Sequence, residues 1–75
     1  MRQKAKKLRD QNGATQEQVA RKTKTTKEYY SLIEKGKRVG TIPYWLRYQM
    51  AFGLSDAELW AIAKEGVKLE GKNTI

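Results

Sequence analysis

Helix start and stop signals recur at short intervals along this chain, and they limit its fold more than any other feature. Thr15 with Gln18, and Ser55 with Glu58, have the spacing of capping boxes at helix N-termini. A helix commonly ends at a residue in the left-handed conformation, which glycine adopts readily. Glycines follow four helix-forming segments, at Gly13, Gly36, Gly53 and Gly66. The sequence therefore predicts several short helices joined by tight turns.

These signals divide the chain into five predicted helices, and no segment reads as a convincing strand. Their approximate ranges are 4–12, 15–23, 26–36, 42–53 and 55–66. The second and third are separated by only about three residues, which is the spacing of a helix-turn-helix, here at about residues 16–36. We expect a single all-α domain over residues 1–66. Residues 67–75 form a tail that is either loose or pairs as a short extended segment in a dimer.

Apolar residues at helical spacing predict which side of each helix faces the core. The expected inner positions are Ala5, Leu8, Val19, Ala20, Thr23, Tyr30 and Ile33. The fourth helix is apolar on nearly every side, with one stripe that contains Trp45 and a second that contains Leu46 and Met50. We expect Trp45 in the core and Trp60 partly exposed. Tyr29 is either half-buried or in contact with a ligand.

The charges of the chain are concentrated in its N-terminal half. Residues 1–38 contain twelve lysines and arginines and four acids, a net charge of +8, whereas residues 39–75 contain four of each. Six of the seven aromatic residues lie after residue 29. The N-terminal half therefore looks like an electrostatic face suited to phosphate, although a solvated basic surface that aids solubility is an equal alternative.

The composition argues against several other classes of protein. The chain has no cysteine and no histidine, which excludes disulfides, the usual zinc sites and histidine-based acid–base catalysis. It has no cluster of carboxylates and no glycine-rich phosphate loop, so we expect neither an enzyme nor a cofactor. The N-terminus lacks the apolar segment of a signal peptide, and no stretch is long enough to span a membrane. The cytoplasm of a bacterial host is the expected compartment.

The segment GATQEQVARKTKTTKEYYSLIEKGKR resembles the helix-turn-helix of the phage repressor/Cro (XRE-like) family. The matching residues are Gly13, Thr15, Gln16, Ala20, Tyr30, Ile33, Glu34, Gly36 and Lys37. The segment PYWLRYQMAFGLSDAELW resembles the last two helices of that family, so the resemblance covers about residues 4–65. It is greatest to small regulators of Gram-positive phages and integrative elements. The resemblance implies a five-helix domain that binds double-stranded DNA.

Four positions depart from the family pattern. Lys24 replaces the glycine of the turn, which would strain a left-handed residue that carries a side chain. Thr23 and Thr25 replace apolar core residues, and Ala14 replaces a larger apolar residue. These substitutions are expected to weaken the core and to affect the geometry of the turn.

With Tyr30 and Ile33 facing inward, the outer residues of the third helix would face the major groove of DNA. These predicted base contacts are Lys27, Glu28, Ser31 and Leu32. Lys27 suits guanine O6 and N7, Glu28 suits cytosine N4, and Leu32 suits a thymine methyl group. An equal alternative for Glu28 is an acid that stabilises the N-terminus of its helix.

The predicted phosphate contacts surround this helix. They are Gln16, Thr26, Lys35, Lys37 and Arg38. The resemblance implies the contact of Gln16, and Thr26 is expected mainly as a helix cap. The alternative for the basic residues is a solvated run of charge. Lys4, Lys6, Lys7 and Arg9 are expected to add long-range attraction only.

The function predicted by these features is that of a sequence-specific transcriptional regulator, best described as a Cro-like repressor of a phage or mobile element. A homodimer on an inverted-repeat operator would bring two recognition helices roughly 34 Å apart. The candidate dimer residues are Leu46, Met50 and Trp60. The alternatives are an antitoxin and a protein-interaction module that uses the C-terminal helices.

Overall fold

The computed structural model describes residues 1–65, and within them the chain forms five helices and no strand. The helices are α1 (Gln3–Gln11), α2 (Gln16–Lys22), α3 (Lys27–Glu34), α4 (Ile42–Phe52) and α5 (Asp56–Lys64). The predicted all-α fold is confirmed, and each predicted helix appears in place. The predicted stop at Gly66 and the tail over 67–75 lie outside the described residues.

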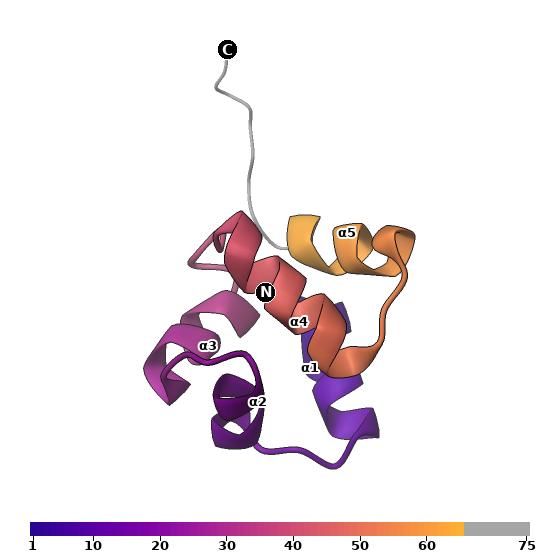
Figure 1. Cartoon of the computed structure of the whole chain (residues 1–75). Coiled ribbons are helices and arrows are strands. Elements are labelled where there is room, and N and C mark those ends of the chain that lie inside the picture. The colour runs from indigo at the N-terminus through magenta and orange to yellow at the C-terminus, as the bar shows by residue number, and fades with distance from the viewer. Residues whose placement is uncertain (66–75) are drawn as a thin grey trace.

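Two groups of helices meet at α4. Helices α2 and α3 pack against each other to form the helix-turn-helix, and α4 contacts both α2 and α5 (Figure 1). Helix α1 contacts α3 and α5, so it joins the two groups behind α4. The outer sides of α2 and α3 are left free by this arrangement.

Side-chain caps set the start of four helices, and three of these caps, at Thr15, Thr26 and Ser55, were predicted from local sequence signals. The Thr15–Gln18 and Ser55–Glu58 capping boxes are both present. Thr26 accepts a hydrogen bond from the amide of Tyr29 at the start of α3. The start of α4 has the same kind of cap, from Thr41, which the sequence analysis did not identify. Gly53 ends α4 with a φ of 64°.

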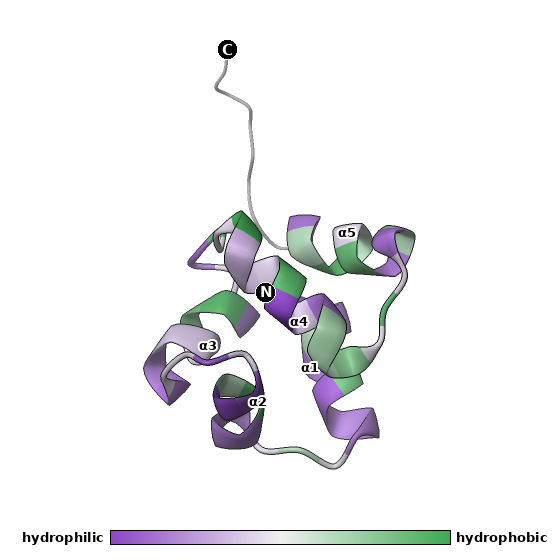
Figure 2. Ribbon diagram, viewed as in Figure 1, coloured by the Kyte–Doolittle hydropathy of each residue, from purple (hydrophilic) through white to green (hydrophobic). Residues whose placement is uncertain are grey.

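The core contains an aromatic cluster from α3 and α4. Tyr30, Tyr44 and Tyr48 are almost completely buried, and Trp45 is 8% exposed, as predicted. Tyr44 and Tyr48 each lie in contact with the Trp45 ring, with ring centroids 5.1 Å apart in both pairs. Figure 2 shows that most of α2 is hydrophilic, whereas α4 and α5 carry more apolar residues. Burial raises the pKa of all three tyrosines.

The polar residues of the α2–α3 turn are accommodated by local hydrogen bonds. Thr23 is fully buried, and its hydroxyl donates to the carbonyl of Val19 (2.9 Å), while Arg47 Nε donates to the carbonyl of Thr23 itself (2.7 Å). Thr25 Oγ1 lies 3.1 Å from Thr23 Oγ1. Lys24 has a φ of 59°, so the predicted left-handed residue with a side chain is confirmed.

Candidate nucleic-acid interface

Helix α3 has one buried side and one exposed side. Tyr30 and Ile33 are fully buried against the core and fix the rotation of the helix about its axis. Lys27 and Glu28 are exposed in its first turn, and Ser31 and Leu32 are half-buried farther along. All four predicted base contacts therefore lie away from the core, on a helix that the core holds in place. A helix with a free outer side can enter the major groove of DNA.

The turn before α3 fixes how this helix crosses α2. The amide of Thr25 donates to the carbonyl of Ala20 (2.8 Å), and that of Lys24 donates to Arg21 (3.2 Å). Ala20 is 2% exposed, and its small side chain lets the two helices approach closely. The exposed end of α3 is therefore held at a defined angle to α2.

A buried carboxylate lies at the other end of α3. Glu34 is 1% exposed, and its two oxygens accept hydrogen bonds from Arg9 Nε (3.1 Å) and Gln16 Nε2 (2.6 Å). One acid thus connects α1, α2 and α3. Because an ionised carboxylate only accepts hydrogen bonds, it orients the amide group of Gln16 with its nitrogen inward. The second N–H of that amide remains available to a phosphate.

The expectation that Arg9 adds only long-range attraction is wrong. Its guanidinium pairs with Glu34 and also donates to the carbonyl of Ala14 (3.1 Å). Burial alone would lower the pKa of Arg9, but the hydrogen bond and the charge of Glu34 outweigh that effect and raise it. Arg9 therefore holds α1 to α3, a role that local sequence patterns do not indicate.

The segment Lys35–Val39 follows α3 and is called the basic loop below. Lys35, Lys37 and Arg38 are all exposed there. The amides of Gly36 and Lys37 donate to Ile33 (3.1 Å) and Leu32 (2.9 Å), which ends the helix and begins the loop. Three exposed cations thus directly follow the exposed side of α3. This is a suitable arrangement for phosphate contacts beside a groove.

Tyr29 supports both the core and this loop. Its ring is half-buried and lies 5.4 Å from the ring of Tyr44. The guanidinium carbon of Arg38 lies 5.5 Å from the Tyr29 ring centroid, a cation–π contact. Of the two alternatives for Tyr29, the half-buried position is the one observed, and the ring also supports a cation of the basic loop.

Arg2 is a residue whose role the sequence patterns did not reveal. Its side chain is fully buried and donates five hydrogen bonds to backbone carbonyls. Burial lowers the pKa of Arg2, but an arginine stays charged because its ordinary pKa lies so far above neutral. Arg2 lies in a run of basic residues that includes the exposed Lys4 and Lys7, so nothing in the local sequence distinguishes it from them.

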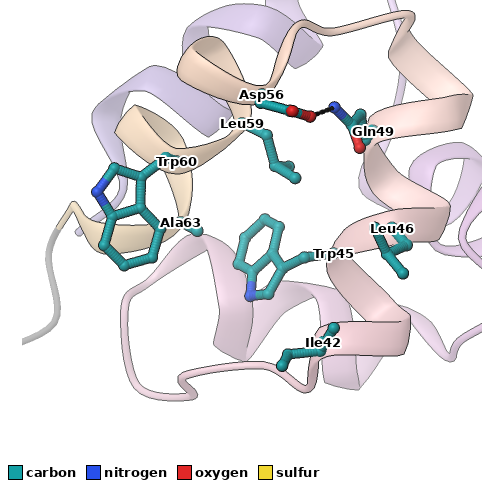
Figure 3. A pocket seen from close by; sticks show the side chains of 8 residues that line it. All are labelled: Ile42, Trp45, Leu46, Gln49, Asp56, Leu59, Trp60 and Ala63. Atoms are coloured by element: carbon teal, nitrogen blue, oxygen red, sulfur yellow. Dashed lines mark hydrogen bonds between the residues drawn. The ribbon is translucent and has the colours of Figure 1, made fainter.

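An apolar groove lies between α4 and α5, away from the helix-turn-helix (Figure 3). It is lined by Ile42, Trp45, Leu46, Gln49, Asp56, Leu59, Trp60 and Ala63. Trp45 and Leu59 face one another across it, and Gln49 donates to Asp56 (2.8 Å) at one end. Of the candidate dimer residues, Leu46 and Trp60 line the groove, and Met50 is exposed on α4. The predicted exposure of Trp60 is confirmed, at 62%.

Other kinds of site have little support in the part of the chain that the structure describes. Residues 1–65 contain no group of three or more histidines, cysteines or acids that could hold a metal ion. None of the helices there has the length and apolar character needed to cross a membrane.

Comparison with known proteins agrees with this geometry. Residues 2–61, most of the chain, match a family described as a helix-turn-helix domain. No curated protein matches the chain. No solved structure matches it either. The match includes α1 to α4 and most of α5, and therefore both the helix-turn-helix and the helices that support it.

Proposed function

Because this chain belongs to the helix-turn-helix domain family, we propose that it is a sequence-specific regulator of transcription that binds double-stranded DNA. Its most specific form would be a Cro-like repressor of a phage or mobile element in a bacterial cytoplasm. The observation that carries the proposal is the exposed side of α3, which presents Lys27 and Glu28 beside the cations of the basic loop.

Base reading would depend on the first turns of α3. The ammonium group of Lys27 can donate to guanine O6 and N7, and the carboxylate of Glu28 can accept from cytosine N4. Leu32 can contact a thymine methyl group, and Ser31 can serve as donor or acceptor. An exposed acid beside DNA is unfavourable unless it reads a base, so Glu28 would contribute to specificity by rejecting other sequences.

Affinity would come mainly from phosphate contacts on both sides of this helix. Gln16 has one free amide N–H at the start of α2, and Thr26 lies at the start of α3. Lys35, Lys37 and Arg38 provide charge at the far end of α3. Contacts of this kind position the helix in the groove without reading sequence.

The proposal includes a homodimer formed through Leu46, Met50 and Trp60. These apolar side chains are exposed on α4 and α5, within the half of the chain whose charges cancel. Two copies can meet there without bringing their +8 halves together. Trp60→Glu should give a monomer in sedimentation at concentrations where the unmodified chain dimerises, while Lys64→Glu on the same helix should not.

Selection of bound duplexes from a random DNA library at two salt concentrations tests the function directly. An enriched inverted repeat with half-sites about 10 bp apart would support a dimeric regulator. Binding that enriches no sequence and disappears with salt would reduce the proposal to phosphate attraction. No binding at either concentration would contradict it.

The apolar groove supports a second candidate, a protein-interaction module. In that case Trp60→Ala should abolish partner binding, while Lys27→Ala with Glu28→Ala should leave it unchanged. The DNA-binding proposal predicts instead that Lys27→Ala with Glu28→Ala should remove sequence-specific binding to DNA.

A further inference from the structure

The buried side chain of Arg2 contacts the backbone on the inner side of the basic loop. Its Nη1 donates to the carbonyls of Ile33 (2.6 Å) and Arg38 (2.8 Å), and its Nη2 donates to Val39 (3.3 Å). Nε and Nη2 also donate to Ala63 at the end of α5 (3.1 and 2.8 Å). These five bonds equal the full number of N–H donors of a guanidinium. Arg2 therefore connects the end of α3, the loop and α5.

Trp45 supports the same part of the loop. The guanidinium carbon of Arg2 lies 5.0 Å from the centre of the Trp45 ring, and Trp45 Nε1 donates to the carbonyl of Val39 (2.9 Å). Gly40 follows with a φ of 85°, and a Cβ there would collide with the indole. The loop is thus fixed through its backbone, while Lys37 and Arg38 remain exposed.

We propose that Arg2 is a positioning residue for phosphate binding by the basic loop. Arg2 is fully buried, so it acts through the loop and not by touching DNA. A cation on a fixed backbone loses less conformational freedom on binding than one on a loose loop. This inference rests on the proposed DNA-binding function, and it adds a residue that determines how strongly Lys35, Lys37 and Arg38 contribute.

Arg2→Lys is the most informative variant, because it keeps the charge and removes the forked arrangement of donors. Its effect on folding is separated from positioning by a double-mutant cycle with Lys37→Ala, an exposed change within the loop. Binding is measured by fluorescence anisotropy on the selected duplex, and on a random-sequence duplex if selection enriches none. All variants are compared well below their melting temperatures.

In the unmodified chain, Lys37→Ala should weaken binding on the order of tenfold, the size of one charge-assisted contact. In the Arg2→Lys background the same change should cost only about two- to threefold, because coupled residues are not additive. Arg2→Lys alone should also make the salt dependence of binding less steep, by about one phosphate contact. Equal costs of Lys37→Ala in both backgrounds would overturn the proposal.

Ile62→Val is the matched control, since it weakens the core where α5 faces Leu8 and Leu54, on a side that includes no residue of the basic loop. In that background Lys37→Ala should keep its full cost. If Arg2→Lys fails to fold, Trp45→Phe replaces it, because it removes the indole donor to Val39 and leaves Arg2 in place. The smaller ring also packs less well against Tyr44 and Tyr48, and the double-mutant cycle separates that loss of stability from coupling. A smaller coupling with Lys37→Ala is expected than for Arg2→Lys, and the absence of any coupling would overturn the proposal. Failure of the unmodified chain to bind any duplex would overturn the DNA-binding function and this inference together, whereas binding without coupling would overturn the inference alone.

Discussion

The two ends of α3 differ in almost every physical respect. At the N-terminal end, Lys27 and Glu28 are exposed, and the helix is capped only by Thr26. At the C-terminal end, Glu34 is buried between Arg9 and Gln16, and the carbonyl of Ile33 accepts from Arg2. The C-terminal end is fixed by Arg2, Arg9 and Gln16. The side chains at the N-terminal end are free to meet a ligand. Free side chains on a fixed helix suit the reading of base edges.

Removal of the buried acid should have the largest effect. Glu34→Ala leaves Arg9 largely buried without its partner and releases Gln16, so the free energy of unfolding should fall by about 3 kcal/mol. Urea denaturation followed by circular dichroism measures the change. For a domain this small, such a loss is a large share of the total stability.

The matched control is the same substitution at the other end of the helix. Glu28→Ala removes an exposed acid, so stability should change by no more than about 0.5 kcal/mol. Equal destabilisation by the two substitutions would contradict the proposed difference between the ends of α3.

The next effect concerns recognition of DNA, which should depend on the exposed end of α3, whereas stability depends on the fixed end. Lys27→Ala or Glu28→Ala should each reduce discrimination between the selected duplex and single-base variants by about 1–3 kcal/mol, mainly at one base position. Competition binding with a set of substituted duplexes measures this. Lys7→Ala, an exposed change on α1, should leave discrimination unchanged. A uniform loss across all sequences would mean that Lys27 or Glu28 contacts phosphate and does not read bases.

High pH should lower the stability of the aromatic core, which supports both ends of α3. Burial raises the pKa of Tyr48 above its ordinary value of 10.0, so above pH 10 the unfolded chain loses a proton that the folded chain keeps. Stability is therefore fully present below pH 10 and falls above it, by up to about 1.4 kcal/mol per pH unit for each such tyrosine.

Tyr48→Phe isolates this contribution, because the Tyr48 hydroxyl is buried and has no hydrogen-bond partner among residues 1–65. The variant should match or slightly exceed the stability of the unmodified chain at pH 7. Its thermal melting temperature should fall less between pH 9 and pH 11. Parallel curves for the two proteins would show that Tyr48 does not titrate differently on unfolding.

The sequence predicted the exposed end of α3 far better than the fixed end. Caps at Thr15, Thr26 and Ser55 are local signals, and they located the helices correctly. The spacing of Tyr30 and Ile33 gave the rotation of α3, and with it the exposed residues. The contacts of these residues with DNA stay predictions, because exposure alone does not identify a ligand.

The contacts at the fixed end join residues far apart in sequence. Arg9 and Glu34 are 25 positions apart, and Arg2 and Ala63 are 61 apart. An arginine in a basic run looks the same whether its side chain is solvated or buried, since its burial depends on how distant helices pack. Tyr44 was missed for a related reason, because α4 is apolar on so many sides that its pattern does not single out one buried stripe.

The smallest expected effect lies in the turn that leads into the exposed end of α3. Lys24 has a φ of 59°, a conformation that costs most residues about 1 kcal/mol and glycine almost nothing. Lys24→Gly should therefore stabilise the fold, by less than about 1 kcal/mol because glycine also gains freedom in the unfolded chain. Lys7→Gly, at an exposed position in the middle of α1, should instead destabilise it by about 1 kcal/mol. If both changes destabilise to the same degree, the turn is not strained, and the exposed end of α3 begins from a relaxed backbone.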